Sequence, residues 1–171
     1  MLRPNSDFKI AHVVKSEFLD GPDPSLPVLV QVQDYWNSVR GDRVGPRVRE
    51  FRIERLPVEI IPAVAVIDIV GSPPDYYYRF FGSRMVEIAG QDLTGRRYYA
   101  DGITGYGFVN AQLLPIMIER RAPIWTRVDW VSEKGRELTT ISVRLPLSED
   151  GETITGAVTA NRFEKMGLND I

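Results

Sequence analysis

The chain alternates between short apolar segments rich in β-branched or aromatic residues and polar segments that contain glycine or proline. Residues of the first kind favour strands, and residues of the second kind mark turns. Five segments are therefore predicted to be strands: 63–70, 76–81, 124–131, 138–147 and 153–163. The polar turns predicted between them lie at 72–75, 133–136 and 149–152.

Apolar residues recur at three- and four-residue steps in two other regions, which is the spacing of one helix face. In 28–40 the recurring residues are Leu29, Val32, Trp36 and Val39. The segment 106–121 has a similar pattern, although Pro115 must kink that helix or mark a first turn. A shorter helix is predicted over 83–89.

The order of these elements is one helix, two strands, a helical middle and three strands. This order predicts an α+β domain with one antiparallel sheet of five strands. The first two strands are apolar on both faces apart from Asp68 and Arg79, whereas a sheet with one face in water alternates. We therefore expect both faces to be covered, one by the domain's own helices and the other by the 28–40 helix or another subunit.

A segment with three prolines and one glycine, 20–27, cannot lie inside a helix or a central strand. It is predicted to be a linker. The chain then divides into an N-terminal arm and linker at 1–27, a domain at 28–163 and a tail at 164–171. The arm docks either on the domain or on a partner.

The length of 171 residues suits one compact domain, and 43% hydrophobic and 26% charged residues are typical of a soluble one. The formal net charge of −2 gives no global attraction to nucleic acid or to an anionic membrane. The opening sequence MLRPNSDFKIAHVVKSEF lacks the apolar core of a signal peptide, and no stretch approaches the roughly 20 apolar residues of a membrane span. We therefore expect a cytoplasmic protein that binds neither nucleic acid nor membrane.

The chain has no cysteine and one histidine, His12, which lies in the arm. The absence of cysteine excludes disulfides, zinc–thiolate sites, iron–sulfur clusters and thiol nucleophiles. One histidine excludes a zinc site with several histidines within one chain, and a Ser–His–carboxylate triad would need the arm folded over the domain. No metal site is predicted.

Short motifs run in order through the domain: Tyr35-Trp36, Arg40-Gly41, Pro46-Arg47, YRFFGS at 78–83, GQDLTGR at 90–96, LPLS at 145–148 and Asp150-Gly151. In this order and spacing, over about 26–163, the chain resembles a bacterial family of PAS-like proteins of largely undetermined function. The resemblance implies a five-stranded antiparallel sheet with helices across one face. It also implies a small ligand held between sheet and helices, and dimerisation through a helix that precedes the first strand.

PAS domains usually sense a signal and pass it to an attached output domain. Because no output domain fits in this chain, a signal must leave through a homodimer or a separate signalling protein. No cofactor is predicted. Without a histidine in the domain, haem held by imidazole is not expected, and without cysteine a cysteine-linked flavin is not expected. These absences do not exclude an organic ligand that binds noncovalently.

The resemblance and the aromatic clusters give two sets of candidate residues. The candidates for a ligand pocket are Arg79, Phe81, Met85, Tyr99, Tyr106, Asn110 and Trp130. The candidates for a helix-mediated dimer contact are Leu29, Val32, Trp36 and Val39. For Trp36 an anchor against the sheet is the favoured alternative. For Arg79 an ion pair with Asp68 or Asp92 is favoured over a ligand carboxylate, since a buried charge needs a partner.

Two further observations limit these candidates. Strand alternation puts Trp125 and Trp130 on opposite faces, so at most one can line a cavity. The arginine-rich segment 40–55 could contact phosphate, but a solvated face with internal ion pairs is the favoured interpretation because the chain is acidic overall.

We therefore predict a sensory or regulatory module, not an enzyme, that binds a small organic ligand and acts as a homodimer. One alternative is a protein-interaction domain whose pocket is filled by aromatic side chains. A third hypothesis is an enzyme with Asp129 or Asp92 as base and Tyr106 stabilising an oxyanion. It requires a carboxylate inside the cavity with a raised pKa.

Overall fold

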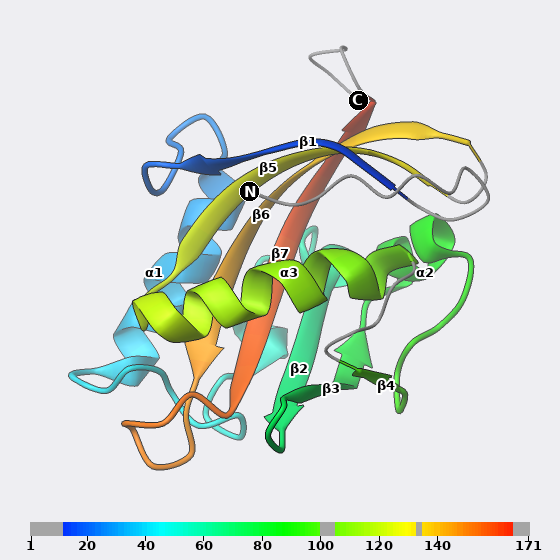
Figure 1. Cartoon of the computed structure of the whole chain (residues 1–171). Helices are drawn as coiled ribbons and strands as arrows, with labels where there is room; N and C mark the ends of the chain where they lie inside the picture. Colours follow the sequence, from blue (N-terminus) through cyan, green and yellow to red (C-terminus); the bar gives the residue numbers. More distant parts are fainter. Residues whose placement is uncertain (1–11, 100–104, 133–134, 166–171) are drawn as a thin grey trace.

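The computed structural model describes residues 12–99, 105–132 and 135–165. The chain forms an α+β fold around one open sheet, in which every neighbouring pair of strands is antiparallel (Figure 1). The seven strands lie in the order β1-β5-β6-β7-β2-β3-β4. They are β1 (His12–Leu19), β2 (Val64–Val70), β3 (Asp75–Phe81), β4 (Arg97–Tyr99), β5 (Ile124–Val131), β6 (Glu137–Leu147) and β7 (Gly156–Lys165).

Within the described residues, three α-helices pack on this sheet: α1 (Pro27–Arg40), α2 (Ser83–Ala89) and α3 (Gly105–Arg120). Two short 3-10 helices, Ile53–Arg55 and Ile61–Ala63, lie between α1 and β2. Figure 1 shows α3 crossing one face of the sheet while α1 lies on the other face. The predicted α+β class is therefore confirmed, and both sheet faces are covered.

The five predicted strands all form and lie side by side, but the sheet has two more. The expectation of five strands is corrected by β1, which pairs with β5, and by the three-residue β4, which pairs with β3. Within β1 only Val13 is fully buried among the side chains described, while Lys15 and Glu17 are exposed. Such mixed patterning is typical of an edge strand, and it explains why the arm did not stand out as a strand. Its described part docks on the domain.

Helix α1 covers its face through two tryptophans. The indole Nε1–H of Trp36 donates to the carbonyl oxygen of Pro146 at 2.7 Å. That of Trp125, on β5, donates to Gln33 Oε1 at 2.7 Å. The second face is therefore covered by α1, which is the first of the two predicted alternatives, and not by a second subunit.

Helix α3 continues through Pro115, so the proline does not mark a first turn. Pro115 is exposed, on the side of α3 that faces away from the sheet, whereas Leu113, Leu114 and Met117 are buried. The apolar stripe holds the helix against the sheet, and tertiary packing thus overrides the helix-breaking preference of proline.

Candidate functional site

A row of polar side chains lies on the sheet face beneath α3. Strand pairing sets Thr126 of β5 beside Ser142 of β6, and Ser142 beside Asn161 of β7. One pair further along β6, Arg144 lies beside Thr159 of β7. Because side chains alternate between faces along a strand, these five point to the same face. Each has a relative exposure of 3% or less, so this face is polar yet buried.

Asn110 of α3 connects the helix to this row. Its Nδ2 donates to the hydroxyl of Tyr78 on β3 at 2.7 Å. Its Oδ1 accepts from Nε of Arg144 at 3.2 Å, and Nη1 of Arg144 donates to Thr126 Oγ1 at 3.0 Å. Burying a guanidinium is costly unless its N–H groups are hydrogen-bonded. Asn110 and Thr126 therefore make this buried arginine tolerable. We call Tyr78, Asn110, Thr126 and Arg144 the α3 polar cluster.

Asn161 extends the polar row toward α2. Its Oδ1 accepts from Ser142 Oγ at 2.8 Å, and its Nδ2 donates to the carbonyl oxygen of Ala63 at 3.0 Å. The same Nδ2 lies 3.7 Å from Sδ of Met85 on α2. One amide thus ties together β6, β7, the segment before β2 and helix α2.

A small interior cavity adjoins these groups. Its volume is about 20 Å³, and its lining residues are Val109, Val128, Trp130, Thr140, Ser142, Arg144 and Asn161. None of these seven is acidic. A β-bulge helps to shape the neighbouring wall, since the register of β2 and β3 shifts between Val66 and Ile67. The shift brings the rings of Tyr78 and Phe81 onto one side, 5.3 Å apart and edge-on.

Four of the predicted pocket residues lie on this side of the sheet or in the helices that cover it. Asn110 belongs to the α3 polar cluster, Met85 contacts Asn161, Phe81 contacts Tyr78, and Trp130 lines the cavity and donates to Thr140 Oγ1 at 2.8 Å. Trp125 contacts α1, so the two tryptophans do lie on opposite faces as predicted.

Arg79 is not part of this site. Its Nε lies 2.7 Å from an Asp68 carboxylate oxygen, and its side chain is 52% exposed. Both residues line a separate pocket of about 170 Å³ that also includes Glu149. The favoured ion pair with Asp68 is confirmed, and Arg79 lies apart from the other candidates for the ligand pocket. Hydrogen bonding to Asp68 raises the pKa of the guanidinium further.

Two predicted pocket residues, Tyr99 and Tyr106, belong to β4 and α3 by their backbone. Their side chains lie outside the described residues.

The four dimer candidates on α1 are mainly internal. Leu29, Val32 and Trp36 have relative exposures of 2%, 0% and 2% within the single chain, and Val39 is half-buried. Trp36 is the predicted anchor against the sheet. These three side chains belong to the core of the single chain, so this face of α1 is not free for a dimer contact.

Neither candidate base of the enzyme hypothesis lies in the cavity. Asp92 is exposed, and hydrogen bonds from Thr94 lower the pKa of its carboxyl. Asp129 occupies the α1 side of β5, where its carboxylate accepts from Thr139 Oγ1 at 2.5 Å. The carboxylate arrangement that this hypothesis requires is therefore missing from the described residues.

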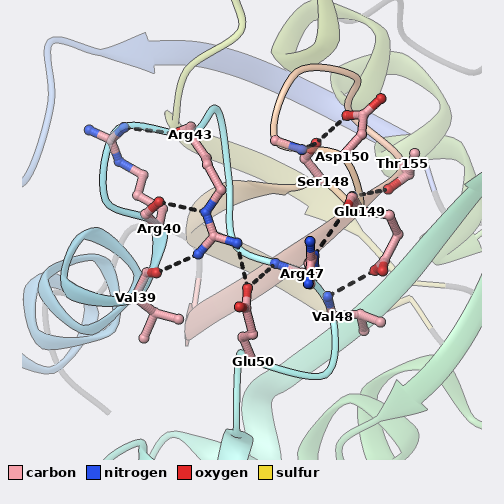
Figure 2. A network of polar contacts seen from close by, with 11 residues as sticks. Val39, Arg40, Arg43, Arg47, Val48, Glu50, Ser148, Glu149, Asp150 and Thr155 are labelled. Carbon is pink, nitrogen blue, oxygen red and sulfur yellow. Dashed lines mark hydrogen bonds and ion pairs between the residues drawn. The ribbon is translucent and has the colours of Figure 1, made fainter.

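The arginine-rich segment forms an internal network with the β6–β7 turn (Figure 2). The guanidinium of Arg43 donates to Glu50 at 2.7 Å and to the carbonyl oxygen of Val39 at 2.8 Å. Arg47 donates through Nε to the carbonyl oxygen of Glu149 at 3.0 Å. Hydrogen bonds from the Arg47 backbone N–H and the Arg43 side chain lower the pKa of Glu50. The favoured interpretation of internal pairing is confirmed for this part of the segment.

A surface groove of about 300 Å³ lies near the start of α1. It is lined by the beginning of α1, the segment before β2, Arg84 of α2 and the far end of β7. Beside the groove, β7 pairs with β2 only as far as Ala160, although it pairs with β6 to Lys165. Within the described residues, 161–165 of β7 therefore have a partner strand on one side only.

Sequence reasoning missed Tyr78, Thr126, Ser142, Arg144 and Asn161. The available signal was the alternation in β6, where Thr140, Ser142 and Arg144 alternate with Ile141, Val143 and Leu145. Such an alternation is typical of a strand whose polar side faces water, and only the position of α3 shows that this side of β6 is buried.

Comparison with known proteins adds no relative: no protein-family model matches the chain, and a search of curated proteins finds no match. No helix in the described part of the chain is long and apolar enough to cross a membrane. Among the described residues, no three His, Cys, Asp or Glu side chains gather as a metal-binding group would require.

Proposed function

We propose that this chain is a PAS-like regulatory module that binds a small organic molecule between α3 and the sheet. The observation that supports it most directly is the α3 polar cluster, centred on the buried Arg144. A core that only has to be stable is more simply filled with apolar side chains, because replacing buried charges by well-packed apolar groups is often neutral or stabilising. Directed polar groups in an otherwise apolar interior are what fixes a small ligand.

The cluster also offers a route by which binding changes the protein's surface. Asn110 holds α3 to both β3 and β6, and the outer side of α3 carries the exposed residues Pro115, Glu119 and Arg120. A ligand that competes for Tyr78 or Arg144 weakens this attachment. The resulting shift of α3 changes the surface that a partner protein contacts, so the partner distinguishes the ligand-bound from the ligand-free state.

The resemblance to PAS-like proteins supports a sensory role and a homodimer. The antiparallel sheet with helices on it agrees with the fold that this resemblance implies. Because Leu29, Val32 and Trp36 are buried within one chain, the proposed dimer uses other surfaces than this face of α1.

Native mass spectrometry of the freshly purified protein tests the ligand and the dimer together. We expect a dimer mass with a co-purified small molecule. Arg144→Met should lose the molecule, whereas the exposed Arg79→Met should retain it. Thr126→Val provides a milder change of the same cluster if Arg144→Met does not fold, as judged by circular dichroism. A wild-type protein that never carries a small molecule contradicts the ligand part, and a monomer at all concentrations contradicts the dimer part.

A second candidate is a protein-interaction domain with a filled core. It is favoured by the small size of the interior cavity, about 20 Å³, beside a surface groove of about 300 Å³. This candidate predicts no co-purified small molecule. It also predicts that a bacterial partner protein captured by the wild type is lost with Val28→Asp in the groove and kept with Val58→Asp, which is 79% exposed and does not line it.

A further inference from the structure

The interior cavity beneath α3 has the size of one water molecule. A buried water needs at least about 10–15 Å³ and two to four polar partners, and this cavity has about 20 Å³ with Thr140, Ser142, Arg144 and Asn161 in its lining. It is therefore large enough for a water and too small for an organic molecule while α3 keeps its position.

Two hydroxyls in the lining each retain hydrogen-bonding capacity. Thr140 Oγ1 accepts the indole N–H of Trp130 at 2.8 Å, so its own O–H can still donate. Ser142 Oγ donates to Asn161 Oδ1 at 2.8 Å, so its lone pairs can still accept. The two lie two residues apart on β6 and point to the same face.

A group that occupies the cavity should therefore accept a hydrogen bond from Thr140 and donate one to Ser142. Water does both, and so does an alcohol or phenol hydroxyl. A carbonyl or ether oxygen can only accept, so it would leave the Ser142 oxygen without a donor.

We propose that this cavity is a hydroxyl site: it holds one water in the ligand-free protein, and the hydroxyl of a small alcohol or phenol replaces that water. The second part rests on the proposed function and names the ligand class for the same site. Val109 is the only residue of α3 among those that line the cavity within the described chain. The rest of the ligand makes room by moving α3 outward at Val109.

High-resolution crystallography of the full chain tests the water. We expect one ordered water within hydrogen-bond distance of both Thr140 Oγ1 and Ser142 Oγ. In Thr140→Val or Ser142→Ala this water should be lost or displaced. An empty cavity in the wild-type protein, or a water that contacts neither hydroxyl, overturns the proposal.

Thermal melting with phenol and with anisole, its methyl ether, tests the ligand class. Phenol should raise the melting temperature of the wild type more than anisole does. The difference should disappear in Thr140→Val, or in Ser142→Ala if the first variant does not fold. It should persist in Thr159→Val, which makes the same change on the same face outside the cavity lining. Equal effects of phenol and anisole overturn the hydroxyl ligand class, while native mass spectrometry reports separately on whether any small molecule binds.

Discussion

The indole of Trp36 and the carbonyl of Pro146, 110 residues apart in sequence, are joined by a buried hydrogen bond of 2.7 Å. This bond fixes α1 against the end of β6. We expect Trp36→Phe to lower the free energy of unfolding by about 1–3 kcal/mol, because it removes the bond and leaves a cavity beside the smaller ring. Urea titration followed by circular dichroism measures the change. Val58→Ala, at a side chain 79% exposed, should change it by no more than about 0.5 kcal/mol. A Trp36→Phe variant as stable as this control contradicts the anchor role.

Asn110 and Tyr78 should be energetically coupled, since the Asn110 amide donates to the Tyr78 hydroxyl at 2.7 Å inside the protein. We expect Tyr78→Phe alone to cost about 0.5–1.5 kcal/mol and Asn110→Ala about 1–3 kcal/mol. In a double-mutant cycle the two changes should fall short of additivity by at least about 0.5 kcal/mol. Full additivity contradicts a direct bond between helix and sheet.

Gly45 lies against the same end of β6. A Cβ atom at this position would overlap the backbone carbonyl of Pro146. We expect Gly45→Ala to destabilise the fold by about 1–3 kcal/mol or more, because a backbone atom cannot move aside as a side chain can. Gly41→Ala is the comparison variant: its φ of +60° strains any side chain, but nothing lies within 4 Å of its Cβ, so its cost is backbone strain without a clash. Chemical denaturation should rank Gly45→Ala as the less stable of the two, and the reverse order contradicts the close approach.

Asp150 should make the protein sensitive to acid. Hydrogen bonds from the backbone N–H groups of Thr153 and Glu152 hold its pKa well below the usual range. A carboxyl whose pKa is lowered on folding stabilises the protein above its unfolded pKa of about 3.9, and that contribution is lost as the pH falls toward the lowered value. The stability difference between wild type and Asp150→Ala should therefore be constant from about pH 5 to pH 8 and shrink below about pH 4. Melting curves across this range and down to pH 3 measure it, and a difference as large at pH 3 as at pH 7 would count against the carboxylate.

The hydroxyl of Thr159 is buried and has no hydrogen-bond partner among the described residues. Leaving a buried hydroxyl unsatisfied costs about 1–3 kcal/mol. We expect Thr159→Val, which keeps the shape, to raise the free energy of unfolding by about 1 kcal/mol, as measured by urea titration. Thr140→Val, which removes the acceptor of the Trp130 indole, should lower it. If both variants are destabilised equally, Thr159 has a partner after all.

Periodicity along the sequence predicted most of the fold. The strand 124–131 and the helix 83–89 were predicted with the bounds that the structure has, because each is a short apolar pattern between clear breakers. The strand β4 was missed because three residues are too few to show a period. For helix α3, Pro115 was predicted to kink the helix or to mark its first turn, and the structure excludes the first turn because the helix begins ten residues earlier, at Gly105.

The candidate site was harder to predict, because it depends on which face a helix covers. Asn110, Met85 and Trp130 came from aromatic clustering and the PAS-like resemblance. In the structure Asn110 belongs to the α3 polar cluster, Met85 contacts Asn161, and Trp130 lines the cavity beside the cluster. Arg144 was not found: an arginine that alternates with valine and leucine indicates a solvent-facing position. Arg144 is buried because α3 covers it, and its partner Asn110 on that helix lies 34 residues earlier in the chain. Nothing in the sequence of β6 itself indicates this cover.

The strand order has a consequence for how the chain assembles. The sheet consists of one group, β1-β5-β6, and another, β2-β3-β4, and β7 joins them. Because β7 follows the other six described strands in sequence, the two halves cannot form a continuous sheet until β7 has been synthesised. Strand β1 pairs with β5, whose residues lie more than 100 positions later in the sequence. Contacts this distant slow folding, so β1 and α1 remain without their sheet partners until β5 and β6 have been synthesised.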